Sequence, residues 1–269
     1  MRPFRLVTFN IAHGRGLAPV QGLTTRRRMK ARLLRIARLL KRLEADAVAL
    51  QEIDRDSSWS GRIDQVEFLR RAGGFAFAEF GANARREGRL RLDYGNAVLS
   101  RHPLLFSESV GFGARRVGGK GFLFAEIDFH GRRLPVANLH LHYGRRARRF
   151  MQLDLFLEYL EARRRAAGAD WAAQPLVCGD LNNGDTRGDA TAALLAHLSE
   201  AGNGSYTLLP ARGRTFPSPL PARRLDFVFL PPGVTGAKGA VVRSLLSDHR
   251  PVVVDFNLPA GGCGRGQTS

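Results

Sequence analysis

Six short polar clusters, each on or directly after an apolar run, constrain this chain more than any other feature. In chain order they supply Asn10, Glu52, His140, Asp180 with Asn182, Asp226, and Asp248 with His249. A carboxylate beside buried aliphatic residues costs free energy unless a cation or a hydrogen-bond donor compensates it. Such a series of placements predicts one active site, assembled from the ends of several strands.

Hydrophobic periodicity predicts two successive groups of strands and helices. Helices are expected over 24–43, 146–165 and near 188–199. Strands are expected over 4–11, 47–50, 75–80, 94–100, 104–112, 121–129, 132–139, 175–178, 225–230, 240–246 and 251–258, with a Pro-rich loop over 210–221. A half that combines a helix with strands, followed by a similar half, favours two sheets packed face to face with helices outside.

The length of 269 residues fits one catalytic domain, expected over 1–258, followed by a Gly-rich tail over 259–269 that is expected to be disordered. No apolar stretch reaches the ~20 residues that a membrane-spanning helix requires. The first strand pattern leaves no room for a signal peptide, and two cysteines give no disulfide framework. These features predict a cytoplasmic protein, or one held peripherally at the inner membrane face.

The formal net charge is +18, and most of it comes from arginine. Such a charge attracts nucleic acid, anionic membrane surfaces and phosphorylated substrates, and a coding bias toward Arg is an alternative origin. The helix expected over 24–43 carries a run of cations whose simplest interpretation is a solvated helix face: Arg26, Arg27, Arg28, Lys30, Arg32, Arg35, Arg38, Lys41 and Arg42. Charge alone therefore narrows the substrate only to something anionic.

In their order, the six clusters resemble the endonuclease/exonuclease/phosphatase superfamily, the DNase I-like metal-dependent phosphoesterases. The resemblance extends from Arg5 to Leu258. It implies an α+β fold, a four-layer α/β/β/α sandwich of two mixed sheets, and hydrolysis of phosphate esters with a divalent metal, usually Mg²⁺. The segments 95–103 and 214–217 are similar to a bacterial subgroup whose substrate is unsettled.

The residues support the same chemistry. Mg²⁺ takes oxygen ligands and often uses only one or two carboxylates. Glu52 with the side-chain oxygen of Asn10 fits such a sparse site, and Asp248 lies close enough in sequence to His249 to reach the metal. We therefore expect Mg²⁺, with Mn²⁺ as the alternative ion.

The remaining polar residues suit phosphoryl transfer. Asp180 is expected to orient or deprotonate a water molecule, while Asn182 donates its amide to a phosphoryl oxygen. His140 and His249 are candidates for holding the phosphate or moving protons, and Asp226 for fixing the tautomer of His249. The expected substrate contacts are Arg101, Arg214 and Arg224.

The sequence thus predicts a phosphodiesterase that acts on a phospholipid or inositol-type headgroup. Nucleases that repair abasic sites resemble Asn-x-Asp at the first cluster, where this chain has Asn10-Ile11-Ala12, and they tend to lack a histidine such as His140. A DNase I-like nuclease acting on DNA or RNA is the alternative. A more distant alternative is an inactive nucleic-acid-binding module, which would have no reason to keep the full polar set buried.

Overall fold

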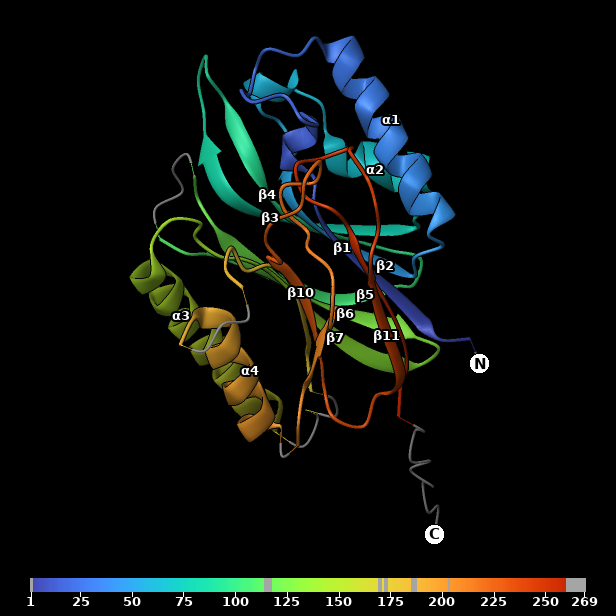
Figure 1. Cartoon of the computed structure of the whole chain (residues 1–269), viewed down its shortest axis with the longest axis vertical. Coiled ribbons are helices and arrows are strands. Elements are labelled where there is room, and N and C mark those ends of the chain that lie inside the picture. The colour runs from blue at the N-terminus through green and yellow to red at the C-terminus, as the bar shows by residue number, and fades with distance from the viewer. Residues whose placement is uncertain are drawn as a thin grey trace.

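Two six-stranded mixed sheets form the centre of the molecule in a computed structural model (Figure 1). The structure describes residues 2–113, 118–168, 171, 174–184, 188–202 and 204–259. The first sheet has the order β11 (Thr235–Val241), β12 (Val252–Asn257), β1 (Phe4–Asn10), β2 (Ala47–Asp54), β4 (Leu92–Ser100) and β3 (Phe77–Arg86). The second has the order β5 (Leu104–Gly111), β6 (Gly121–Phe129), β7 (Arg132–His140), β8 (Leu176–Asp180), β10 (Asp226–Leu230) and β9 (Thr207–Leu209).

Helices cover the outer faces of both sheets. The helices are α1 (Arg26–Arg42), α2 (Gln65–Gly73), α3 (Arg146–Ala167) and α4 (Ala190–Ala201), with 3₁₀ turns at Ala12–Gly14 (η1) and Ser58–Ser60 (η2). In Figure 1, α1 and α2 lie on one side of the paired sheets, and α3 and α4 lie on the other. The expected four-layer α/β/β/α sandwich is confirmed. Within the described part of the chain, no helix is long and apolar enough to cross a membrane.

Alternation along β1 shows how the sequence builds these layers. Phe4 and Leu6 pack between the two sheets, whereas Val7 and Phe9 pack toward the helices. A strand whose both faces are covered must be apolar on both, and β1 is buried along almost its whole length. The polar side chain of Asn10 follows on the same face as Leu6, so it projects into the space between the sheets.

The sequence prediction missed two elements of secondary structure and misplaced a third. The prediction missed α2, which Asp64 caps by accepting a hydrogen bond from the backbone N–H of Glu67, and also β9. The strand predicted over 240–246 is wrong, because β11 ends at Val241 and residues 242–250 form a loop. Gly236 and Gly239 lower the strand propensity of β11, which is why the sequence placed this strand too late. The tail predicted to be disordered lies outside the described residues from 260 onward, and the domain boundary stays a prediction.

Gly179 permits the close approach of β8 to β7 beside the polar residues. Its φ is +138°, and a Cβ at this position would lie 1.9 Å from the carbonyl oxygen of Leu139. We expect Gly179→Ala to lower the free energy of unfolding by about 3 kcal/mol, from backbone strain and overpacking. Gly111→Ala is the matched control, because no atom lies within 4 Å of its Cβ position. Equal unfolding midpoints for the two variants in urea would contradict this account.

Candidate active site

Three adjacent strands of the second sheet place His140, Asp180 and Asp226 in one row. β7 and β8 are parallel and pair His140 with Asp180 at their carboxyl ends. β10 is antiparallel to β8 and pairs Asp226, its first residue, with Asp180. Side chains at paired positions lie on the same face of a sheet, so the three groups meet at one edge. In the first sheet, β1 and β2 are also parallel and pair Asn10 with Gln51.

A β-bulge directs Glu52 into this edge. Val48 and Leu50 face the helices, and strict alternation would turn Glu52 the same way. The register between β2 and β4 shifts between Gln51 and Ile53, and Glu52 adopts φ +50°. The extra residue re-aims the carboxylate, whose Oε1 accepts a hydrogen bond from Lys120 Nζ at 3.0 Å. A bulge is thus the local feature that adds Glu52 to the site.

Asp180 is the centre of the hydrogen-bond network. Its Oδ2 accepts from Asn10 Nδ2 at 3.0 Å, and its Oδ1 accepts from the backbone N–H of Asn182 at 2.9 Å. His140 Nε2 lies 3.4 Å and His249 Nε2 3.6 Å from Asp180 Oδ2. The predicted convergence is therefore confirmed for these residues, which come from β1, β7, β8 and two loops.

His249 and Asp226 form the hydrogen-bonded pair that the sequence predicted. The distance from His249 Nδ1 to Asp226 Oδ2 is 2.9 Å, and both groups are buried. Burial opposes protonation of His249, but the neighbouring carboxylates of Asp226 and Asp180 raise its pKa to about 10. His249 is therefore a cation at neutral pH.

The two buried aspartates differ in their acidity. Burial opposes ionisation of Asp180, but His249 and His140 more than offset this cost and lower its pKa below the ordinary value. Burial raises the pKa of Asp226, because His249 offsets the cost of its charge only in part. Asp180 is consequently a firmly ionised carboxylate that binds protons weakly.

Lys120 is a site residue that the sequence analysis missed. Its Nζ lies 2.7 Å from His140 Nε2, in addition to the contact with Glu52 Oε1, and the residue is buried. Burial and then the charge of Lys120 lower the pKa of His140, so this imidazole is neutral near pH 7. The available signal was a lysine enclosed by glycines, directly before a strand of buried residues.

We expect Lys120→Met to reduce kcat by about 100-fold, as for the loss of one donor to a developing oxyanion. The same change should raise the pKa of His140, because a neighbouring positive charge is removed. Steady-state kinetics and an NMR titration of His140 would test both effects. Lys238→Met, at an exposed position of β11, is the control. An unchanged kcat would exclude Lys120 from the reaction.

Other polar residues of the clusters join the two sheets. Asn138 Nδ2 donates to the carbonyl oxygens of Leu50 and Ala97, and its Oδ1 accepts from Gln51 Nε2 at 2.7 Å. Gln51 Nε2 also donates to Thr8 Oγ1 at 3.0 Å. The bonds of Asn138 cross from one sheet to the other, whereas the bond between Gln51 and Thr8 joins β2 to β1 within the first sheet. Together they fix the separation of the strand ends that carry the site.

The fit of a divalent cation rests on the carboxylates. Ligand atoms of Asp180, Asp226 and His249 lie within 4.8 Å of one another, and Asp226 Oδ1 accepts no hydrogen bond from a described residue. That set could hold a cation, but protonated His249 already supplies positive charge there. Glu52 has a side chain that is 23% exposed, against 1% for Asp180, so Glu52 has room for an ion that keeps several waters.

The other residues expected near the metal are engaged with protein groups. Asn10 Oδ1 accepts a hydrogen bond from the backbone N–H of Ala12 at 3.0 Å. Asp248 forms an ion pair with Arg15 and accepts from Ser247 Oγ at 3.2 Å. A carboxylate or amide oxygen carries a second lone pair, so these contacts still allow metal ligation. The metal-binding roles of both residues stay predictions.

The three arginines expected to bind substrate have different positions. The prediction is wrong for Arg101, which lies away from the candidate site. It follows Ser100, and Ser100 pairs with Ala47 at the end of β2 opposite to Glu52. Arg101 Nε donates to the carbonyl oxygen of Ala45. Arg224 donates to the carbonyl oxygens of Pro210 and Ala211, so it ties down a loop. Arg214 is exposed next to Thr215, whose Oγ1 accepts from the backbone N–H of Asp226, and its role stays a prediction.

Comparison with known proteins agrees with this geometry. The profile of the Endonuclease/Exonuclease/phosphatase family matches residues 7–249, from β1 through His249. The chain belongs to the endonuclease/exonuclease/phosphatase family. The curated relative YbhP of Escherichia coli K12, described only as an uncharacterized protein, is 29% identical over 171 residues. That match covers 61% of this chain and 63% of YbhP, so it spans less than two thirds of the relative.

Solved structures of this family share the fold. An endonuclease/exonuclease/phosphatase from Beutenbergia cavernae gives a TM-score of 0.70 at 24% identity, over 96% of this chain and 72% of that protein. Sphingomyelinase C from Streptomyces griseocarneus gives a TM-score of 0.66 at 19% identity, over 96% of this chain and 100% of that protein. The mannosyl-6-phosphatase of Bacteroides thetaiotaomicron gives a TM-score of 0.68 at 15% identity, over 95% of this chain and 100% of that protein. At these identities the likeness shows the fold alone.

Proposed function

We propose that this family member is a Mg²⁺-dependent phosphodiesterase that hydrolyses a phospholipid or inositol-type headgroup ester. The observation that carries the proposal is the row of His140, Asp180 and Asp226, with the cationic groups of His249 and Lys120 directed into it. Two acids with cationic donors at one strand edge suit an anionic phosphoryl group that gains charge in the transition state.

Asp180 holds the attacking water in this proposal. A carboxylate with a depressed pKa accepts a proton poorly, so alignment is the better role for it than full deprotonation. Asn10 and the backbone N–H of Asn182 fix the orientation of this carboxylate through their hydrogen bonds. Water then forms the new P–O bond in line with the ester bond that breaks, and the proton that this water loses passes to a non-bridging phosphoryl oxygen of the product.

His249 supplies a proton to the leaving oxygen. It is a cation near pH 7, and Asp226 keeps Nδ1 engaged so that Nε2 faces Asp180. Neutral His140 and Lys120 donate to phosphoryl oxygens as the negative charge of these oxygens grows. Asn182 Nδ2 donates to the carbonyl oxygen of Leu141 at 2.9 Å and to Asp180 Oδ2 at 3.3 Å, so the expected bond from its amide to a phosphoryl oxygen would replace the longer of these two. These donors are held in place before the reaction, so little reorganisation is required.

Glu52, with Asn10 and Asp248, would hold the metal, with Mn²⁺ as the alternative to Mg²⁺. A bound divalent ion supplies Lewis-acid neutralisation of the phosphate and the leaving oxygen. Burial alone would raise the pKa of the Glu52 carboxyl, but the positive charges of Lys120 and His13 more than offset this effect and hold the pKa well below its ordinary value. Glu52 is therefore an anion and suited to bind a cation.

The substrate class rests on several supports. Ala12 and His140 depart from the abasic-site nuclease pattern, and the net charge of +18 favours an anionic substrate surface. One solved structure with this fold is a sphingomyelinase C. Hydrolysis of DNA or RNA is the second candidate, since the same charge would attract a phosphate backbone.

A panel of phosphate esters tests the proposal. Purified protein is incubated with sphingomyelin, cardiolipin, inositol phosphates, short RNA and plasmid DNA, each with Mg²⁺ or with EDTA. We expect Mg²⁺-dependent release of a phosphorylated headgroup and no release in EDTA. Efficient degradation of plasmid DNA without activity on any phospholipid would establish the nuclease function instead.

A further inference from the structure

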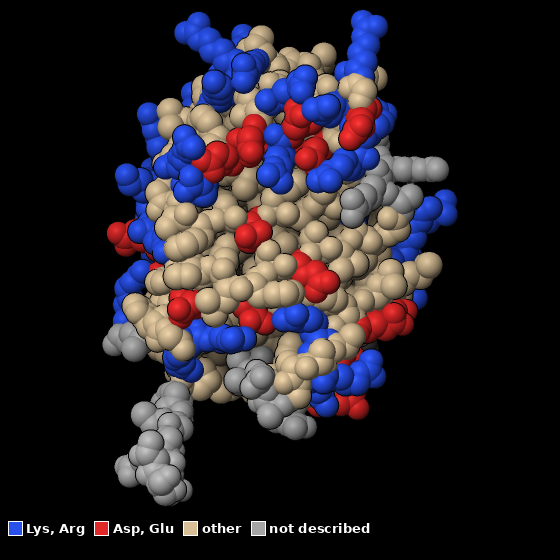
Figure 2. Space-filling model, turned by 180° about the vertical axis from the view of Figure 1, so that it is seen from behind, with Lys and Arg blue, Asp and Glu red and all other residues tan. Residues whose placement is uncertain are grey.

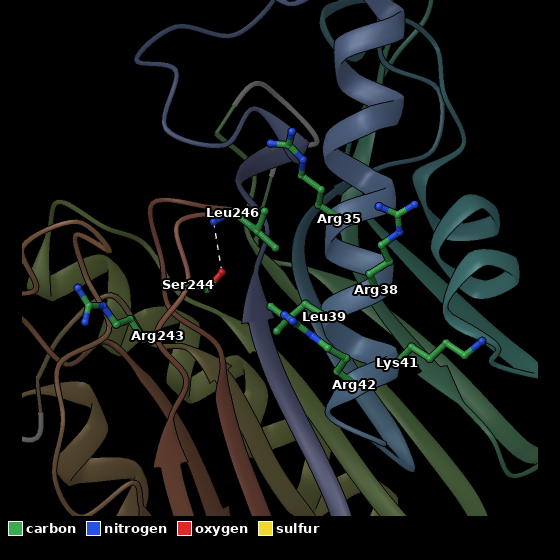
Figure 3. Close-up of a pocket in the computed structure, with 8 residues that line it drawn as sticks. All are labelled: Arg35, Arg38, Leu39, Lys41, Arg42, Arg243, Ser244 and Leu246. Carbon is green, nitrogen blue, oxygen red and sulfur yellow. Dashed lines mark hydrogen bonds between the residues drawn. The ribbon is translucent and has the colours of Figure 1, made fainter.

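A groove of about 750 Å³ separates α1 from the loop 242–250, outside the catalytic row (Figure 3). Cationic side chains line it: Arg35, Arg38, Lys41, Arg42 and Arg243. The described residues that line the groove include no Asp or Glu. Figure 3 shows Leu39 and Arg42 projecting from α1 toward the loop, while Lys41 points away from it.

The charge of this groove is uncompensated. No carboxylate in the described ranges forms an ion pair with any of its five cations. The opposite face of the molecule looks different: Figure 2 shows Asp and Glu mixed with Lys and Arg along its top and a broad central area of other residues. Like charges brought together at a groove raise its potential and attract an anionic partner.

Exposed aliphatic side chains accompany these cations. Leu245 lies on the loop between Ser244 and Leu246 of the groove and is 58% exposed. Leu34 on α1 is 37% exposed and lies four residues before Arg38, on the same side of the helix. Ser244 Oγ accepts from the backbone N–H of Leu246 at 3.2 Å, which shapes the segment that presents Leu245.

We propose that the groove is a docking surface for an anionic phospholipid bilayer, an inference that rests on the proposed lipid-headgroup function. Lipid phosphates would enter between Arg35 and Arg42, while Leu245 and Leu34 enter the boundary between headgroups and acyl chains. Cations beside exposed aliphatic side chains are typical of surfaces that lie in the membrane interface. The part of the lining that the structure describes has no aromatic side chain for stacking bases, which argues against single-stranded nucleic acid as the occupant.

The loop 242–250 connects this surface with catalysis. Leu246 lines the groove, Ser247 Oγ donates to the carbonyl oxygen of Asn10 at 2.8 Å, and His249 belongs to the site. A bilayer bound at the groove therefore contacts the segment that carries the catalytic histidine.

Vesicle co-sedimentation tests the docking surface. The full chain is mixed with phosphatidylcholine vesicles that contain increasing phosphatidylglycerol. Arg35→Glu with Arg42→Glu should lower the partition coefficient at least about tenfold, because each engaged cation contributes to binding. Leu245→Ser should lower it severalfold without a change in charge. The control is Arg164→Glu with Arg165→Glu at exposed positions in the last turn of α3, which carries the same charge change and should bind like the wild type.

A soluble ester separates docking from catalysis. Hydrolysis of bis(4-nitrophenyl) phosphate without vesicles should be the same in the wild type and all these variants, since none of the changed residues lies in the catalytic row. If the wild type does not hydrolyse this ester, the proposed function is wrong, but the result of the vesicle-binding experiment still stands. Equal vesicle binding by the groove and control variants would overturn the docking surface. Binding of duplex DNA but no vesicles would also overturn it and assign the groove to nucleic acid.

Discussion

Glu52→Gln is expected to lower the Mg²⁺-dependent activity about a thousandfold, because a hard cation loses its principal anionic ligand. The substitution keeps the volume of the side chain, and a higher Mg²⁺ concentration should restore part of the rate. Activity would be measured against Mg²⁺ concentration on a soluble phosphodiester. Glu158→Gln, at an exposed position of α3, is the matched control and should behave like the wild type.

The structure adds a second readout to this experiment. Glu52 is also the partner of Lys120, so its neutralisation leaves a buried ammonium with less compensation. Thermal unfolding of the variant must therefore be recorded, and rates must be compared at a temperature where both proteins are folded. A folded variant with the wild-type response to Mg²⁺ and EDTA would place the ion elsewhere. In that case the ligand atoms of Asp180, Asp226 and His249 become the next position to test.

Asp226→Asn is expected to lower kcat about 100-fold and to leave KM within about twofold, since Asp226 acts on the substrate through His249. The raised pKa of His249, about 10, means that the protonated form persists through neutral pH and is lost as the pH approaches that value. Asparagine removes the neighbouring negative charge, so the pKa falls and the alkaline limb of the kcat–pH profile moves to lower pH by about 1 to 3 pH units.

Two further variants define the role of this pair. Asp226→Glu restores the charge and should recover part of both the rate and the alkaline limb. Asp154→Asn on the exposed face of α3 is the control for a change of charge alone. If Asp226→Asn changes KM as much as kcat and leaves the alkaline limb in place, His249 is not the proton donor.

Local patterns in the sequence determined much of the fold and the chemistry of the site. β1, with apolar side chains on both faces, and α1, with its periodic Met29, Leu33 and Ile36, were predictable because burial leaves a period in the sequence. The pairing of Asp226 with His249 was also predictable, because a buried aspartate requires a partner and few were available. Features with weak periodicity were missed: α2 is short, and glycines interrupt β11.

Only the tertiary structure decided which groups actually meet. The parallel pairing of β7 with β8 and the antiparallel pairing of β10 align His140, Asp180 and Asp226, a register that depends on strand order rather than on spacing in the sequence. The bulge that turns Glu52 toward Lys120 could not be predicted from the alternation of side chains along β2. Strict alternation would have directed this carboxylate to the helices.

The position of a charge was likewise decided by the fold. The sequence contained the cations of α1, but their significance depended on the loop 242–250, which lies beside them and closes a groove with no Asp or Glu among its described lining residues. The same dependence removed Arg101 from the site, because antiparallel pairing carries it to the other end of the strands. Residue type fixes what a side chain can do, whereas strand register and packing fix which partners are close enough for it to act on.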